Sequence, residues 1–120
     1  MTKKADPLLN ALKLPGGARF YKCALQVNPH HYSNLYRGKP LQGNAHTYAR
    51  EITDKAAELG ISVLAVTDHN NVSDVGMIRE AGKERHIHVL PGFEIATSEG
   101  VHVLCIYPSD TDEDRLGRYL

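Results

Sequence analysis

The chain has 120 residues, 42% of them hydrophobic and 23% charged, which suits one globular domain with a modest core. No apolar run approaches the roughly 18 residues that a membrane-spanning helix needs, and the first residues lack the apolar segment of a signal peptide. The formal net charge is zero, which argues against strong non-specific binding to DNA. We therefore expect no membrane segment.

Charge is nevertheless distributed unevenly along the chain. Residues 1–60 hold nine Lys/Arg and four Asp/Glu, a net charge of +5, whereas residues 61–120 hold five and ten, a net charge of −5. A basic first half could face phosphate, although such a bias is more often only a solvated surface. The two cysteines, Cys23 and Cys105, lie in apolar, strand-like runs and form no C-x-x-C motif, so we expect reduced, buried thiols in a cytoplasmic protein.

The first third of the chain predicts a short helix, a strand and a long loop. Residues 5–14 carry four leucines after an Asp6-Pro7 start, and Pro15 and two glycines end this helix. We assign residues 1–17 to an N-terminal helix and linker, and residues 18–120 to the main domain. Residues 19–28 are bulky and apolar enough for a strand, and residues 29–44 predict a polar loop.

The remaining elements predict parallel strands joined by helices. A helix over residues 44–59, with Asn44 as its cap, precedes a buried strand that begins at Ser62, and this order predicts a right-handed parallel unit. A second helix is predicted over residues 71–85. A third strand begins at residue 87, is interrupted by Pro91 and Gly92, and resumes over 93–97. Residues 101–107 predict a fourth, strongly apolar strand that pairs with residues 93–97 as a hairpin. The tail is acidic from Asp110, and Leu116, Tyr119 and Leu120 then predict a helix that begins as the chain ends.

Polar residues stand where these strands end, and this coincidence predicts a functional site. Asp68 and His69 follow the buried run of residues 63–67, Glu94 follows the Pro-Gly bend, and His102 lies in the fourth strand. Parallel strands carry their C-terminal ends to one edge of a sheet, which is where α/β proteins bind ligands. Carboxylate and imidazole groups together are plausible ligands for Zn²⁺, Mn²⁺ or Fe²⁺, and such an ion suits activation of water against a phosphoester.

Each residue also has a plainer interpretation. Asp68 could cap the following helix, His69 could be a hydrogen-bonded turn residue, and Glu94 could pair with an arginine. His102 could be a satisfied core histidine. The other five histidines are surface residues on base rates: His30, His31, His46, His86 and His88.

Three motifs resemble those of the polymerase and histidinol phosphatase (PHP) domains. They read V-T-D-H-N, P-G-F-E-I-A-T and G-V-H-V-L-C-I-Y, and the resemblance covers roughly residues 18–108. It implies a distorted (βα)₇ barrel with up to three metal ions at its C-terminal rim and phosphoester hydrolysis. It also implies that His69, Glu94 and His102 bind metal, with Asp68 as a site carboxylate. Our predicted metal ligands are therefore Asp68, His69, Glu94 and His102, and the first three are the predicted catalytic residues.

The chain departs from this family in two respects. The expected first motif, D-L-H-x-H-T, is replaced by A-L-Q-V-N-P, so Gln26 and Asn28 stand where the family has metal-binding histidines. Amide side chains are poor ligands for these metals, so fewer than three ions are expected. A seven-unit barrel needs on the order of 200 residues, so the chain resembles the N-terminal half of a PHP domain, of the kind fused to large ATPases.

Two functions, with a third and plainer one, follow from these observations. The first is a PHP-type metal-dependent phosphoesterase or nuclease-like domain, with phosphoester or nucleic acid substrates, as an N-terminal module of a larger protein. The second is a catalytically inactive PHP-like module with a structural or regulatory role in an ATPase or nucleic-acid-processing protein. The third is an α/β module that binds a small anion. Open sheet edges also predict self-association or a partner that covers them.

Overall fold

The computed structural model describes residues 20–36 and 43–120, so the helix predicted over residues 5–14 lies outside the described residues. Strands and helices alternate over most of this range, as the sequence predicts. In chain order the elements are β1 (Cys23–Val27), α2 (His30–Tyr36), α3 (Ala45–Glu58), β2 (Val63–His69), α4 (Val75–Glu84), β3 (His88–Ala96), β4 (His102–Ile106) and α5 (Glu113–Tyr119).

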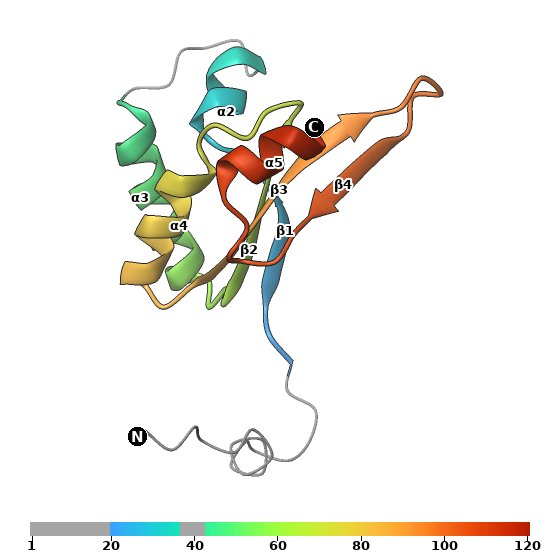
Figure 1. The fold of residues 1–120 in the computed structure, drawn as a ribbon. Coiled ribbons are helices and arrows are strands. Elements are labelled where there is room, and N and C mark those ends of the chain that lie inside the picture. The colour runs from blue at the N-terminus through green and yellow to red at the C-terminus, as the bar shows by residue number, and fades with distance from the viewer. Residues whose placement is uncertain (1–19, 37–42) are drawn as a thin grey trace, which may run out of the picture.

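The four strands form a single sheet in the order β1-β2-β3-β4. β1, β2 and β3 run parallel, and β4 returns antiparallel to β3, so the predicted parallel strands and the hairpin are confirmed. The sheet curls into a half-barrel, α3 and α4 lie along one of its faces, and the β3–β4 hairpin extends away from them (Figure 1). The described strands do not close into a barrel.

The core lies between the sheet and its helices. Leu64 and Val66 of β2 and Val89 and Phe93 of β3 are at most 4% exposed and pack in one cluster with residues of α3 and α4. Side chains alternate between the two faces of a strand, so this spacing fixes which face of β2 and β3 meets the helices. Leu116 of α5 is fully buried in the same cluster, which joins the last helix to this face.

Local signals in the sequence set the ends of α3. The side chain of Asn44 accepts a hydrogen bond from the backbone N–H of Thr47 at 2.9 Å, as a helix cap does. Leu59 is the C-cap, and Gly60 follows with a φ of 69°, a conformation that favours glycine. The predicted helix over residues 44–59 is therefore confirmed.

The predicted loop over residues 29–44 is partly wrong, because α2 occupies its first half. Its first turn starts at Pro29, whose carbonyl accepts a hydrogen bond from the N–H of Ser33 at 3.2 Å. Pro29 and Ser33 are both buried, so tertiary packing holds a polar segment that has little helical pattern of its own.

The predicted interruption of the third strand is also wrong, because β3 runs unbroken through Pro91 and Gly92. The carbonyl of Pro91 accepts from Tyr107 on the β4 side of the strand. The N and C=O of one strand residue point to the same side, so the missing N–H of Pro91 removes no hydrogen bond to β2. Position 92 requires glycine, because a Cβ at this position would overlap the backbone carbonyl of Cys105 on β4.

The prediction of two buried thiols is wrong for Cys23, which is exposed, while Cys105 is half-buried; both are free. β1 and β4 are the edge strands of the described sheet, so each is packed on fewer sides than β2. Among the helices described, none is both long and apolar enough to cross a membrane.

Candidate metal centre

Strand register brings His69 and Glu94 side by side. β2 and β3 pair in parallel from Val63 and His88 onward, and the last pair of this ladder is His69 with Glu94. β4 then returns along β3, with Leu104 opposite Glu94 and His102 near the start of the hairpin's second strand. Three neighbouring strands thus each supply one potential metal ligand.

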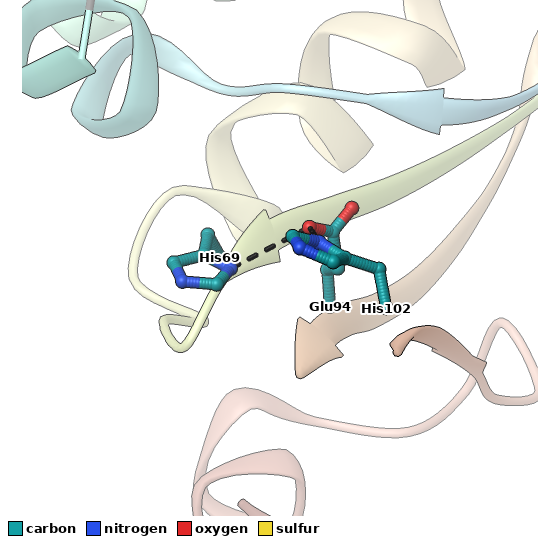
Figure 2. A group of neighbouring side chains, drawn as sticks. All are labelled: His69, Glu94 and His102. Carbon is teal, nitrogen blue, oxygen red and sulfur yellow. Dashed lines mark hydrogen bonds and ion pairs between the residues drawn. The ribbon is translucent and has the colours of Figure 1, made fainter. Parts of the chain in front are cut away.

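The three side chains meet around one carboxylate oxygen, as Figure 2 shows. Nδ1 of His102 lies 2.6 Å from Oε1 of Glu94, and Nδ1 of His69 lies 3.5 Å from the same oxygen. The two imidazole rings stack with centroids 5.9 Å apart. One ligand atom from each residue lies within 4.8 Å of the others. The predicted convergence of His69, Glu94 and His102 is therefore present in the structure.

The cluster is open to solvent on one side. The side chain of Glu94 is 9% exposed, that of His69 24% and that of His102 60%. His102 is therefore not a core histidine, which was the plainer interpretation of its sequence context. Leu104 and Ile106, which follow His102 on the same face of β4, are each 37% exposed. The half-barrel thus presents the cluster on an accessible face.

Asp68 lies on the opposite face of the sheet. Leu64 and Val66 point toward the helices, and Asp68 continues their alternation, while His69 points the other way. The structure therefore does not bring the Asp68 carboxylate, which we expected to bind metal, into the cluster of His69, Glu94 and His102. Adjacent residues on a strand cannot both point to one face without a bulge.

The carboxylate of Asp68 is instead fully buried in a hydrogen-bond network. Oδ1 accepts from the backbone N–H of His69 at 2.7 Å, and Oδ2 accepts from Nδ2 of Asn71 at 2.6 Å. Nδ1 of His31 lies 2.9 Å from Oδ2, and the backbone N–H of His31 donates to Asp74. Asp68 thus links α2, through His31, and the turn after β2, through Asn71, to the end of β2. The next residue along the chain is His69, which belongs to the cluster.

The sequence pattern does not predict His31 as a partner of this carboxylate. The only signal was its place after the first strand, among several other histidines. Gln26 stands in the sequence where the resemblance implies a histidine, and its Nε2 donates to Oε2 of Glu94 at 2.6 Å. Both residues are thus connected to the strand ends that carry the site, one on each face of the sheet.

Hydrogen bonding sets the charge state of the central carboxylate. The bond from His102 lowers the pKa of Glu94 below its ordinary value of 4.5, and the bond from Gln26 and the nearby imidazoles act in the same direction. Burial acts against this shift, but it is outweighed. Glu94 is therefore ionised at neutral pH, which is the form that binds a metal ion.

The donor set fits a divalent metal ion. Two imidazoles and one carboxylate are found at zinc sites that keep an open position and at non-haem iron sites. Ligand atoms around a tetrahedral zinc are roughly 3.3 Å apart, and here they lie within 4.8 Å of one another, so small side-chain rotations suffice. In the part of the chain that the structure describes, this is the one such group of three residues.

Fold and site together define a mixed α/β half-barrel with a candidate divalent metal centre at the ends of its strands. No protein-family model matches the chain. The chain is 33% identical over 78 residues to an error-prone DNA polymerase of Caulobacter vibrioides, a match that covers 65% of this chain and 7% of the polymerase. This match supports the PHP-like domain that the three motifs indicate.

A solved structure is also similar. It is the crystal structure of a candidate metal-dependent phosphoesterase from Bifidobacterium adolescentis, with 22% identity and a TM-score of 0.44 over 70% of this chain and 25% of that chain. This chain therefore spans only a small part of both proteins.

Proposed function

We propose that this chain is a PHP-type metal-dependent phosphoesterase domain in which His69, Glu94 and His102 hold a divalent ion. The convergence of these three side chains on Oε1 of Glu94 is the observation that carries the proposal. When bound, the ion would supply Lewis-acid stabilisation of a phosphoryl oxygen and a water molecule of lowered pKa. The substrates proposed are phosphoesters, and the polymerase match favours nucleic acid among them.

The protein residues have separate roles in this proposal. Glu94 provides the negative charge that holds the ion, and its low pKa keeps it ready to bind at neutral pH. His69 and His102 approach from the two neighbouring strands and leave the solvent side open for substrate. Asp68 acts as a positioning residue, because its bond to the N–H of His69 fixes the backbone that carries this imidazole.

A second candidate function is a PHP-like module that binds metal without efficient catalysis. The hydrogen bond from Gln26 to Glu94 favours it, because an amide donor stands where the family has a metal-binding histidine. In that case the domain would serve a structural or regulatory role in a larger protein. A fused ATPase module and self-association through the sheet edges stay predictions.

Elemental analysis of the purified chain, paired with a phosphoester assay, separates these functions. We expect bound Zn²⁺, Mn²⁺ or Fe²⁺ in the wild-type protein and none in Glu94→Ala. Metal with turnover of p-nitrophenyl phosphate or its bis-ester supports the enzyme, and metal without turnover supports the inactive module. A protein that binds no divalent metal refutes both proposals.

His88→Ala provides a matched control. His88 is an exposed histidine at the start of the strand that carries Glu94, and it is not part of the cluster. We expect it to keep the metal that His102→Ala loses. Equal loss in both variants would indicate non-specific binding of metal by surface histidines.

A further inference from the structure

Gln26 forms a hydrogen bond with Glu94, the central carboxylate of the cluster. Its Nε2 lies 2.6 Å from Oε2, whereas both imidazoles contact Oε1. The two carboxylate oxygens therefore have different partners, one an amide of β1 and the other the histidine pair. An ion that replaces the hydrogen bonds at Oε1 would leave the bond at Oε2 intact.

The end of the amide that faces Glu94 is fixed by charge. An ionised carboxylate only accepts hydrogen bonds, so the N–H₂ group and not the carbonyl must point at it. This places positively polarised hydrogen atoms beside Oε2. A second cation approaching this oxygen would meet a donor in place of a ligand, and the donor opposes its binding.

An irregularity in β1 aims Gln26 at this position. Ala24 pairs with Leu64 and Val27 pairs with Val66, so β1 advances three residues while β2 advances two. The extra residue lets Ala24 and Val27 both pack against the core while Gln26 reaches the other face. Such irregularities redirect side chains beside functional sites.

The surrounding side chains offer little to a second ion. Within the described ranges, 20–36 and 43–120, His69, Glu94 and His102 form the one group of three His, Cys, Asp or Glu side chains close enough together to share an ion. The other buried carboxylate near these strand ends, that of Asp68 on β2, points to the opposite face and is bonded to three donors. A second ion would therefore have Oε2 of Glu94 as its main protein ligand.

We infer that Gln26 is a positioning residue. Its hydrogen bond to Oε2 of Glu94 prevents a second metal ion from binding there, so the site holds a single ion, bound through Oε1. This inference rests on the proposed metal centre and adds its stoichiometry. In this inference Gln26, which stands where the resemblance implies a metal-binding histidine, orients the carboxylate of Glu94 instead of binding metal itself.

The test measures metal content, affinity and coordination in the full chain. After loading with Zn²⁺ and dialysis, we expect one ion per wild-type chain. Gln26→Leu keeps much of the side-chain volume without the donor, and we expect its Zn²⁺ affinity to fall 10- to 100-fold, the usual cost of losing a partner behind a metal ligand. The visible absorption bands of the Co²⁺-loaded protein should shift in the same variant. Leu25→Ala, an exposed neighbour on β1, should change none of these properties.

Gln26→Glu tests the stoichiometry directly. It replaces the donor with an acceptor of the same shape, so we expect two Zn²⁺ ions per chain after the same loading and dialysis. Two ions in the wild-type chain, one ion in Gln26→Glu, or unchanged affinity in Gln26→Leu would each overturn this inference while leaving the metal centre standing. A wild-type chain without bound metal would overturn the proposed centre and this inference with it.

Discussion

Replacing Asp68 with asparagine keeps the size of the side chain but removes its charge and half of its acceptors. Oδ1 can still accept from the N–H of His69, but the new amide N–H₂ faces the donors of His31 and Asn71. A hydrogen bond to a charged group contributes about 1.5–3 kcal/mol. The His31 side chain is 38% exposed and can turn to water, and Asn71 keeps its bond to Ser73, so the loss is smaller than the sum.

We therefore expect Asp68→Asn to lower the free energy of unfolding by about 2–4 kcal/mol. For a domain of this length, that corresponds to a fall in Tm of roughly 10 °C. Urea denaturation in EDTA measures the change without any contribution from bound metal. Glu51→Gln, an exposed acid on α3, is the control and should stay within about 0.5 kcal/mol of wild type. Unchanged stability with complete loss of metal in Asp68→Asn would refute the structural role and restore Asp68 as a ligand.

Three further predictions concern pH, the hairpin and the last helix. The bond from His102 lowers the pKa of Glu94 in the folded protein, so the ionised carboxylate should stabilise the fold above pH 4.5. This contribution should disappear as the pH falls through the pKa of Glu94 in the folded state. In EDTA, the acid unfolding of Glu94→Gln should lack this pH-dependent part. Gly92→Ala should destabilise the chain by about 1–3 kcal/mol in urea, because its Cβ overlaps the backbone of Cys105, and an unchanged midpoint would show that β4 can move away. Leu116→Ala should cost about 2–5 kcal/mol, since this side chain is fully buried, and a loss below 1 kcal/mol would mean that α5 is not docked in solution.

The sequence predicts the central elements well because their signals are local. Asn44 and Gly60 mark the ends of α3, and the apolar run after Ser62 marks β2. The hairpin likewise follows from two apolar strands separated by a short turn. These features depend on residues close together in the chain, which is where pattern and propensity are informative.

Features that depend on tertiary packing have no such local signal in the sequence. β3 continues through Pro91 and Gly92 because β4 lies against one edge of it, and α2 forms because a buried carboxylate, that of Asp68, bonds to His31. Neither contact has a local signature. Propensity alone therefore predicts an interrupted strand and a loop.

The candidate site could be predicted in part. Strand ends and the three motifs identify His69, Glu94 and His102, because the C-terminal ends of parallel strands meet at one edge. The placement of Asp68 follows from strand alternation, a period of two that also follows from the sequence once β2 is taken to continue through His69. The contribution of Gln26 depends on the irregular register of β1, which only the paired strands reveal.

The order of the strands also determines how a bound ion would act mechanically. His69 and His102 stand on β2 and β4, which have β3 between them and so share no ladder of backbone hydrogen bonds. An ion held by both would link three strands and tie the start of β4, next to the turn of the β3–β4 hairpin that projects from the sheet in Figure 1, to the end of β2. Slower amide hydrogen exchange and greater resistance to proteases along the hairpin would then accompany metal binding, whether or not the domain hydrolyses anything.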